Sequence, residues 1–537
     1  MENKADIQLT DDDWSLLQSK GIGEAEVKKQ YKCLRKGVPA PEVLRTAAID
    51  DGILAVSETD QEAYVGIWDR YLEKGKSISH FIPASGTAHR FFRELFNFLH
   101  ADYDEPQTNY EKNFFKHLPS FAFYAELDKV CLEKTGENVQ ELLEKGQYKQ
   151  VLSLMLTEEG LNYRSQPSAL FKFHTDKSKR FVAIQKYLPK KIVKYYSSFE
   201  DTRTPIQEHL IESAMVSGEK GGVVNVCFTV AEEHQESVQN YINEFRYPIE
   251  KKFGLNFLIT LPCQSHATDT LILTDENKWL RDETGKLCFH CGGHGSLFPN
   301  FCELKAEVAF VTNIDNVAID PTKKLVARSR KMMGGLLVQT QKMINKYLKV
   351  LDKEDVSDDK LIEIINFVEN VLNIKRQNIL SMPREEQLDY LRTKLNRPLR
   401  VCGMVRNEEE QGGMPCWVRN DDGTSSLQIV EYYQIAQNEE LKKSFVRSTH
   451  FNPVDMVCFL RDYKGKPYDL NAFANLNEAI VCHKKAVEGN ELIMLERPGL
   501  WNGCMADWNT IFVDVPVKTF TPVKNINDLL RNEHQNL

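Results

Sequence analysis

Residues 223–261, VVNVCFTVAEEHQESVQNYINEFRYPIEKKFGLNFLITL, carry the alternation of a strand, a helix and a second strand. The apolar, β-branched run at 223–230 predicts the first strand, the helical spacing at 234–253 predicts the helix, and the run at 257–261 predicts the second strand. Two strands joined through a crossover helix pair in parallel with a right-handed connection. The sequence therefore predicts an α/β fold.

Strand and helix patterns continue on both sides of this unit. Short apolar runs predict further strands at 77–83, 271–273, 308–312, 427–430, 456–460, 492–495 and 512–515. Helical patterns predict an N-terminal helical region at 1–75 and two helical insertions, at about 101–165 and about 322–395. We expect one core at 76–530, lengthened by these insertions and followed by a tail at 531–537.

The composition is that of an ordinary globular protein. The 537 residues are 42% hydrophobic and 27% charged, and their formal net charge is −9. Proteins that bind duplex nucleic acid usually carry a basic excess, so we expect no nucleic-acid partner. The polar, acidic N-terminus does not resemble a signal peptide, and no run approaches the roughly 20 apolar residues that span a bilayer. Twelve scattered cysteines indicate reduced thiols, and we expect a cytoplasmic protein that does not contact membranes.

The segment 81–92, FIPASGTAHRFF, is the first candidate site. A predicted strand ends in the small residues Ala84, Ser85 and Gly86, and a helix is expected from about His89 to Leu99. Backbone N–H groups at the positive end of a helix dipole bind anions, and Arg90 could add a bidentate phosphate contact. The alternative is a tight turn with an exposed arginine.

A glycine-rich turn at 292–295 is the second candidate. Gly293, His294 and Gly295 indicate either a close backbone approach to a ligand or a simple turn. A competing hypothesis is a zinc site, because Cys288 and Cys291 have C-x-x-C spacing. Its further ligands would come from Cys302, His290 and His294. A second paired knuckle is missing from the sequence.

The segment 310–316, FVTNIDN, is the third candidate, because an apolar strand ends there in polar residues. Open α/β sheets bind ligands at the carboxyl ends of their strands, and Asp315 could hold Mg²⁺ through its carboxylate. The alternative is an aspartate that caps a turn. Further along, Glu496 ends a predicted strand, and Lys518 and Lys524 lie in a proline-stiffened, extended segment.

In their order along the chain, these segments resemble the sugar nucleotidyltransferases, most closely the UTP–glucose-1-phosphate uridylyltransferases. FIPASGTAHRFF is similar to their nucleotide-binding loop L-A-G-G-x-G-T-R-L-G, with Gly86 and Arg90 in matching places. Gln264-Ser265 resembles their N-Q-S segment, and 293–295 resembles P-G-H-G-D, with Ser296 where aspartate is usual. The turn at 313–316 matches their N-I-D-N.

The resemblance continues beyond the second predicted insertion. LQIVE at 427–431 is similar to the Q-L-L-E strand, Phe451-Asn452 to the start of F-N-T-N-N, and 480–484 with Leu495-Glu496 to I-V-N-P-K … L-E. The segment 515–530 follows V-P-R-x-R-F-x-P-V-K … D-L-L. The whole chain also resembles an uncharacterised bacterial domain family that pairs a P-A-S-G-x-A loop with a P-G-L-W-N-G segment.

The resemblance implies a Rossmann-like, GT-A-type fold with a mixed sheet flanked by helices. It implies that the phosphate of a sugar 1-phosphate attacks the α-phosphorus of a nucleoside triphosphate, UTP being favoured, and that pyrophosphate leaves. Asp315 would hold Mg²⁺, and the catalytic cations would be Arg90, Lys172 and Lys524. The implied nucleotide-binding residues are Ala84, Ser85, Gly86, Gln264, Gly293, His294 and Gly295, and the implied sugar-binding residues are Glu431, Asn452 and Glu496.

One departure bears on activity. The family places a catalytic lysine in a P-K-[GS] segment, and the counterpart here is Pro167-Ser168-Ala169-Leu170, with serine in place of lysine. Lys172 could substitute, since on a strand it would share a face with Ser168. A catalytically inactive protein of the same fold, one that binds sugar nucleotides or has a regulatory role, therefore stays an alternative. A zinc-bearing interaction protein is another.

Overall fold

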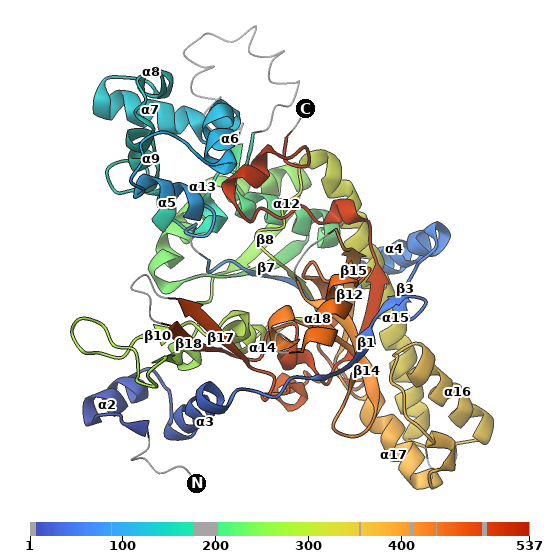
Figure 1. The fold of residues 1–537 in the computed structure, drawn as a ribbon. Coiled ribbons are helices and arrows are strands. Elements are labelled where there is room, and N and C mark those ends of the chain that lie inside the picture. The colour runs from blue at the N-terminus through green and yellow to red at the C-terminus, as the bar shows by residue number, and fades with distance from the viewer. Residues whose placement is uncertain are drawn as a thin grey trace. The chain divides into compact units, whose positions relative to one another are not determined.

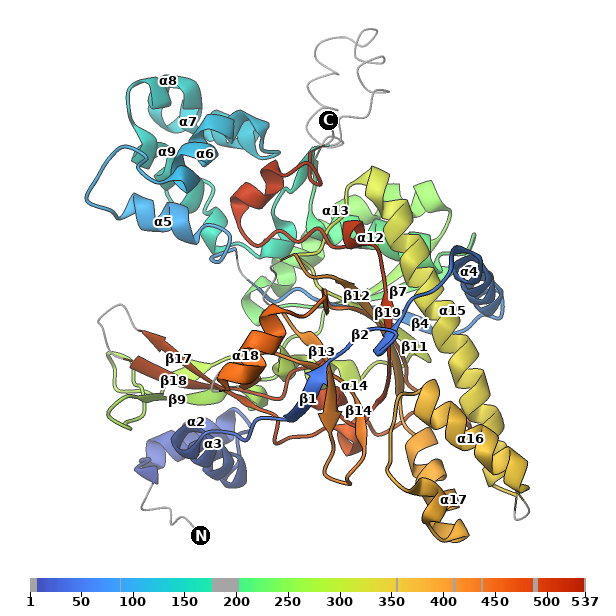
Figure 2. The same ribbon diagram turned by 45° about the vertical axis from the view of Figure 1, so that its right-hand side comes forward.

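The computed structural model describes residues 7–86, 88–175, 202–353, 356–408, 412–435, 438–485 and 491–535 (Figures 1 and 2). The chain forms two compact units, and each unit draws on distant parts of the sequence. The first unit contains Met1–Phe81, Pro262–Val311 and Arg330–Pro516. The second contains Ile82–Leu261, Thr312–Ser329 and Val517–Leu537.

The first unit is built on a mixed sheet. β4 (Ile78–Pro83) and β11 (Val308–Thr312) are parallel, as are β12 (Leu399–Arg406) and β19 (Asn509–Asp514). β16 (Asp455–Phe459) runs antiparallel to β12. β11 is buried along its whole length, which is typical of a strand with both faces covered.

Helices flank this sheet. Trp68 of α4 (Glu58–Leu72) packs edge-to-face on Phe310 of β11, with the ring centroids 5.3 Å apart. α4 also touches the long helix α15 (Asp320–Leu351) at Gly335, where an added Cβ would lie 1.9 Å from the Tyr64 carbonyl oxygen. α16 (Asp358–Asn370) and α17 (Arg384–Leu395) follow, so the segment expected to be a second insertion is helical (Figure 1). The predicted α/β class, with a mixed sheet flanked by helices, is confirmed.

The N-terminal region is not purely helical, and this prediction was wrong. After α2 (Asp11–Ser19) and α3 (Glu24–Lys36), the chain forms β1 (Glu42–Thr46), β2 (Ala48–Ile49) and β3 (Gly52–Leu54). β1 pairs with β13 (Met414–Arg419), and β3 pairs with β19. β1 and β3 depend on partners more than 350 residues away, so no local pattern marks them, and β2 pairs in turn with β3.

A second, four-stranded sheet in the first unit has the order β10-β9-β18-β17. Its strands are β10 (Phe289–His290), β9 (Thr270–Thr274), β18 (Glu491–Glu496) and β17 (Ile480–Lys485). One face packs Leu271, Leu273 and Leu495 against α2 and α3. Because side chains alternate across a strand, Glu496 points to the opposite face.

The second unit contains the strand–helix–strand element that the sequence predicts. β7 (Val223–Thr229), α13 (Gln235–Phe253) and β8 (Asn256–Thr260) follow one another, and β7 and β8 pair in parallel. α12 (Pro205–Ser217) begins with a capping box at Thr204 and Gln207.

Helices also fill the segment that the sequence predicts as the first insertion. It holds α6 (Asn109–His117), α7 (Tyr124–Thr135), α8 (Val139–Glu144) and α9 (Tyr148–Leu156), which appear with α5 (Arg93–Leu99) in Figure 1. These helices enclose an aromatic core that includes Phe92, Phe114, Phe123 and Phe171.

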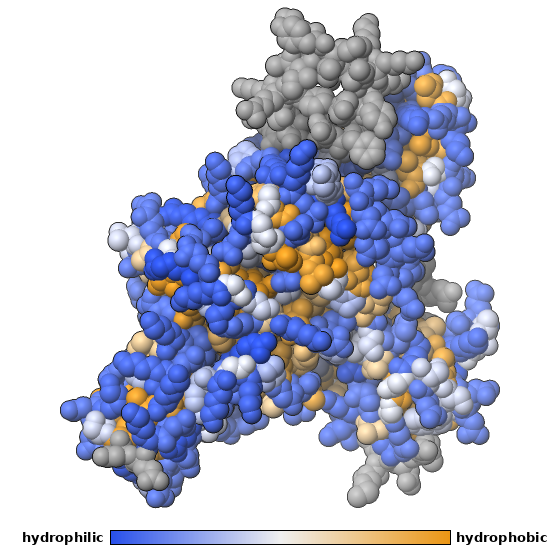
Figure 3. Space-filling view, turned by 180° about the vertical axis from the view of Figure 1, so that it is seen from behind, coloured by the Kyte–Doolittle hydropathy of each residue, from blue (hydrophilic) through white to orange (hydrophobic). Residues whose placement is uncertain are grey.

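Hydrophilic side chains cover much of the face shown in Figure 3. Among the described residues, no helix is both long and apolar enough to cross a membrane. All twelve cysteines are free thiols in the structure, as the sequence predicts.

Candidate functional site

The predicted site residues fall into two groups, one in each unit. The first, which we call the loop cluster, consists of Gly86, Arg90, Ser168, Asp315 and Lys524 and belongs to the second unit. Backbone hydrogen bonds hold the loop after β4 in place. The Ala84 N–H donates to the Thr229 carbonyl oxygen at the end of β7, at 2.9 Å.

Ser168, the residue in the place of the expected lysine, lies against this loop. Its backbone N–H and its hydroxyl both donate to the Gly86 carbonyl oxygen, at 3.0 and 3.1 Å. The side chain is 4% exposed. Ser168 therefore holds the loop in position and supplies no charge to a ligand.

The helix after the loop begins later than predicted. α5 is Arg93–Leu99, and residues 88–92 form turns. Phe91 and Phe92 are both buried in the aromatic core. Adjacent helix positions point about 100° apart, so turns allow both rings to pack inward. The loop residues are not the first turn of a helix, and the expected contribution of a helix dipole at Ala84, Ser85 and Gly86 was wrong.

Asp315 lies in the turn after β11. The Asn316 N–H closes this turn by donating to the Asn313 carbonyl oxygen at 3.1 Å, and His209 Nε2 of α12 lies 3.1 Å from the Ile314 carbonyl oxygen. In the part of the chain that the structure describes, no hydrogen bond reaches the Asp315 carboxylate. Burial raises the pKa of Asp315 to about 6, and the positive charge of Arg90 opposes this rise.

The segment that leads to Lys524 is bound to the same turn. Asn316 Oδ1 accepts from the Thr521 N–H at 2.9 Å, and the Val523 N–H donates to the Asp315 carbonyl oxygen at 2.9 Å. Lys524 follows directly and is exposed. The structure thus brings together a half-buried carboxylate and two cationic residues that are far apart in the sequence.

The sequence predicts that Lys172 shares a strand with Ser168, and this prediction was wrong. Residues Ser168–Leu170 form a 3₁₀ turn, in which positions four apart do not share a face. The Lys172 amine lies 2.8 Å from Glu126 Oε2 of α7. The tyrosine hydroxyl of Tyr163 donates to the same carboxylate oxygen at 2.8 Å. A carboxylate thus already neutralises this cation.

The second group, which we call the carboxylate cluster, consists of Gly293, His294, Glu431, Asn452, Glu496 and Trp501 and belongs to the first unit. Its glycine run allows a close approach of the chain at 496–499. Gly293 has φ +70°, and an added Cβ there would lie 2.9 Å from Glu496 Oε2. An added Cβ on Gly295 would lie 2.0 Å from the Pro498 carbonyl oxygen. The glycines are explained by these contacts within the protein.

His294 and Trp501 are stacked, with ring centroids 3.8 Å apart and planes 4° apart. The Leu500 N–H donates to His294 Nδ1 at 2.9 Å, so the proton of the neutral ring is on Nε2. Burial lowers the pKa of His294 to about 4. Trp501 Nε1 donates to Glu431 Oε1 at 3.1 Å. The stacked pair therefore holds Glu431 in position.

Glu431 has a raised pKa. Burial is the main cause and the charge of Glu496 adds to it, whereas hydrogen bonds from Trp501 and Asn502 oppose it. Asn452 is 3% exposed, and its Nδ2 has no hydrogen-bond partner among the described residues. Its backbone N–H donates to the Gly413 carbonyl oxygen at 2.8 Å, and an added Cβ on Gly413 would lie 3.2 Å from Glu431 Oε1.

Gln264 is used within the protein. Its Nε2 donates to the Cys291 carbonyl oxygen at 2.8 Å and lies 3.3 Å from the Thr268 hydroxyl. The hydrogen bond to Cys291 stabilises the turn before Gly293, and the amide oxygen of Gln264 stays available as an acceptor for a ligand.

The zinc hypothesis is not supported. Among the described residues, which include Cys288, Cys291, Cys302, His290 and His294, no three histidine, cysteine, aspartate or glutamate side chains are grouped so that they could hold a metal ion. His294 instead stacks on Trp501.

Comparison with known protein families gives a match over most of the chain. The model of a domain of unknown function, DUF4301, matches residues 10–188 and 184–535. The chain belongs to this family. A search of curated proteins finds no match. Among solved structures, a UDP-glucose phosphorylase from Trypanosoma brucei matches with a TM-score of 0.44 and 11% identity, over 98% of this chain and 78% of that chain.

Trp501, which connects His294 to Glu431, is not among the site residues that the sequence predicts. The available signal was a tryptophan in the P-G-L-W-N-G segment, five residues after the strand-terminal Glu496. Asn316, whose amide binds the turn at Asp315 to the segment before Lys524, is not among them either.

Proposed function

We propose that this protein is a Mg²⁺-dependent sugar-1-phosphate nucleotidyltransferase, with UTP as the favoured nucleotide. In this reaction a phosphate oxygen of the sugar 1-phosphate forms a bond to the α-phosphorus, and the bond from that phosphorus to pyrophosphate breaks. The observation that carries the proposal is the Asp315 carboxylate, which has a raised pKa and no hydrogen bond in the described chain. Arg90 lies near it, and its turn is bound to the segment that ends at Lys524. The ordered sequence resemblance supports the proposal.

The chemistry of the loop cluster fits Mg²⁺. This ion is usually held by one or two protein carboxylates together with phosphate oxygens, and Asp315 supplies one carboxylate without a competing hydrogen bond from the described residues. When bound, Mg²⁺ would neutralise part of the phosphate charge. Asp315 is the residue that we propose as its ligand.

The protein's own cations supply the rest of the neutralisation. Nucleotidyl transfer depends on positioning and charge, and it needs no covalent nucleophile. Arg90 can bind two triphosphate oxygens in parallel, and Lys524 can bind the phosphate of the sugar as a point charge. The backbone at Ala84, Ser85 and Gly86 lies against the nucleotide in this proposal. We assign Lys172 no catalytic role in it, because its amine is paired with Glu126.

For the carboxylate cluster we propose recognition of sugar and nucleotide hydroxyls. Glu431 and Glu496 accept hydrogen bonds from hydroxyl groups, and Asn452 Nδ2 donates one. Gln264 and the turn at Gly293, His294 and Gly295 face the base or the sugar in this proposal.

A second candidate function is binding of a sugar nucleotide without turnover. It is favoured by Ser168, which replaces the expected lysine and is hydrogen-bonded to Gly86, and by the ion pair of Lys172. Loss of one cation at the phosphates costs a few kcal/mol of transition-state stabilisation, which lowers the rate but does not prevent binding.

A screen of nucleoside triphosphates against sugar 1-phosphates, read out as pyrophosphate release, tests the proposal. We expect release with at least one pair in the presence of Mg²⁺. Arg90→Gln should lower the rate by about 100-fold, because it removes a charge at the transferring phosphate. Arg93→Gln is the matched control, since Arg93 is also exposed and lies three residues further along the chain.

The same screen separates the two functions. Thermal stabilisation by a nucleoside diphosphate sugar, together with no pyrophosphate release from any pair, would establish the binder and overturn the enzyme. Lys172→Ala should leave the rate close to that of the wild type. A large loss of rate in this variant would show that Lys172 replaces the missing lysine after all.

A further inference from the structure

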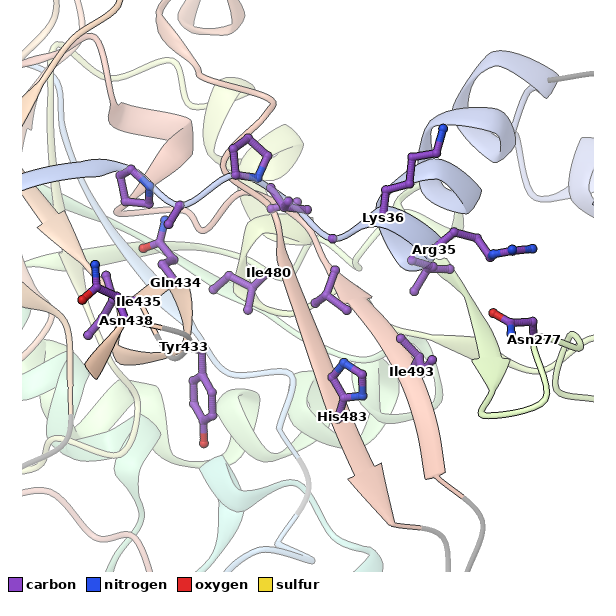
Figure 4. A pocket seen from close by; sticks show the side chains of 18 residues that line it. Arg35, Lys36, Asn277, Tyr433, Gln434, Ile435, Asn438, Ile480, His483 and Ile493 are labelled. Atoms are coloured by element: carbon purple, nitrogen blue, oxygen red, sulfur yellow. The ribbon is translucent and has the colours of Figure 1, made fainter. Parts of the chain in front are cut away.

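A pocket of about 540 Å³ lies beside β17 in the first unit, and Figure 4 shows the side chains that line it. Its basic and apolar groups do not face one ligand, because Arg35 and Lys36 extend away from Ile480 and Ile493. We therefore assign this pocket no ligand.

A second pocket of the first unit, of about 570 Å³, is lined differently. Its walls come from β3 and β19, near one edge of the mixed sheet, and from the helices α4, α15 and α16. One lining residue is Tyr64, at the point where α4 touches α15. Small-molecule sites have volumes of roughly 300–1,000 Å³, so this pocket is large enough for one organic ligand.

Buried apolar side chains form much of this lining. Ile53, Ile511 and Phe512 come from the two strands, and Leu336 and Phe367 come from α15 and α16. All five are buried among the described residues of the protein, so they present a packed wall to a ligand. A ligand that fits this wall needs an apolar surface.

Two further apolar side chains of the pocket are exposed to water. Leu54 of β3 is 42% exposed, and Val371, which follows α16, is 40% exposed. They come from the strand side and the helix side of the pocket. A ligand that packs on both removes this apolar surface from water, and the binding free energy gained grows with the area covered.

The polar groups that line the pocket are almost all neutral. The hydroxyls of Tyr64 and Thr340 and the amide of Gln339 have no hydrogen-bond partner among the described residues. Asp50 is the one charged residue in the described lining, and no lining residue is basic. An anion would therefore lose its hydration without gaining a counter-charge.

We propose that this pocket binds a neutral, mainly apolar organic molecule with a polar group that forms a hydrogen bond to the lining. The apolar body lies on the walls from β19, α15 and α16, and the polar group uses one of the unpartnered hydroxyl or amide groups. None of the lining residues belongs to the loop cluster or the carboxylate cluster. Binding here does not depend on the proposed function, because its measurement requires neither nucleotide nor sugar.

Fluorescence titration of the full-length protein with phenylnaphthylamine and with anilinonaphthalenesulfonate tests the proposal. The two probes share an aromatic body, and only the second carries a negative charge. We expect saturable binding of phenylnaphthylamine at one site. The affinity for the sulfonate should be lower by about tenfold or more, because the pocket offers no cation to offset desolvation of the anion.

A filled pocket provides the second arm of the test. Ala55→Trp places an indole at an exposed lining position and should abolish binding of phenylnaphthylamine. Ala63→Trp, at an exposed position of α4 that does not line the pocket, is the matched control and should leave the affinity unchanged. Thermal unfolding and circular dichroism check that both variants are folded.

An added charge provides the third arm. Gln339→Lys supplies a cation at an exposed lining position and should raise the affinity for the sulfonate by about two- to fivefold, the effect of a single exposed charge pair. Asn366→Lys, at an exposed position of α16 outside the lining, should not.

Four results would overturn the proposal. They are the absence of saturable phenylnaphthylamine binding, equal affinity of the wild type for the two probes, and an affinity for phenylnaphthylamine that Ala55→Trp leaves unchanged. The fourth is an affinity that falls as the protein concentration rises, which would make the pocket an interface between two copies of the chain. None of them bears on pyrophosphate release, so this proposal and the nucleotidyltransferase proposal fail independently.

Discussion

Asp315 illustrates how one half-buried carboxylate links stability to the proposed chemistry. Its pKa is raised from 3.8 to about 6 by burial, so the folded protein holds this proton more tightly than the unfolded chain does. The contribution of Asp315 to the free energy of unfolding is therefore complete below about pH 4 and is lost as the pH rises through about 6.

We predict that Asp315→Asn removes this part of the pH dependence. At pH 7 and without divalent metal, the variant should be more stable than the wild type by about 1–3 kcal/mol, because one pKa unit corresponds to about 1.4 kcal/mol. Urea unfolding of both proteins at pH 4 and pH 7 measures the effect. Identical pH dependence of the two proteins would show that Asp315 is not desolvated.

Trp501 provides a second test at the level of single residues. Trp501→Phe keeps an aromatic ring on His294 but removes the donor to Glu431 Oε1. Trp508→Phe is the matched control, because Trp508 is 3% exposed and its Nε1 has no hydrogen-bond partner among the described residues. A hydrogen bond to a half-buried acceptor contributes about 0.5–1.5 kcal/mol, so Trp501→Phe should destabilise the protein by about that much more than the control. Equal losses in urea unfolding would mean that the hydrogen bond contributes nothing.

The turn after β10 can be tested at Gly293, with Gly285 of the turn before β10 as the control. Gly293 and Gly285 both have positive φ, at +70° and +82°, but only Gly293 is close to another side chain, the Glu496 carboxylate. Gly285→Ala should cost about 1 kcal/mol from backbone strain alone. Gly293→Ala should cost more, since Glu496 must also move, and the difference should appear as a lower urea midpoint. A midpoint equal to that of Gly285→Ala would show that Glu496 adjusts freely.

Elements with a strong local pattern could be predicted from the sequence, and elements that depend on distant partners could not. The β7–α13–β8 element and the capping box at Thr204 follow from local residues. β1 forms only because β13 lies beside it, and residues 88–92 turn so that Phe91 and Phe92 reach the aromatic core. The stacking of His294 on Trp501 depends on the fold in the same way, because 207 positions separate the two residues in the sequence.

At the scale of the whole molecule, the candidate residues sort by unit. Arg90, Ser168, Asp315 and Lys524 come from three separate segments of the second unit. Gly293, Glu431, Asn452 and Glu496 come from separate segments of the first. The order of the motifs in the sequence predicted the candidate site residues. It could not show that Ser168 binds the loop carbonyl or that Glu126 neutralises Lys172, because these are contacts between distant segments.

The chain has a net charge of −9, so the cations that would bind the phosphates of a ligand are few and local. Arg90 and Lys524 belong to the loop cluster, and Lys172 forms an ion pair with Glu126. We predict that Mg²⁺ raises the thermal unfolding temperature of the wild type in the presence of a nucleoside triphosphate and has no such effect on Asp315→Asn. An equal rise in both proteins would place the metal elsewhere.

The most direct test of the proposed activity compares Mg²⁺-dependent pyrophosphate release by the wild type and by Asp315→Asn, with UTP and a panel of sugar 1-phosphates. We predict release by the wild type with at least one sugar 1-phosphate and a rate lower by about 100-fold or more in the variant, the usual cost of removing an electrostatic contact to the transition state. Pyrophosphate release at the full rate by Asp315→Asn, or no release by the wild type with any pair, would contradict it.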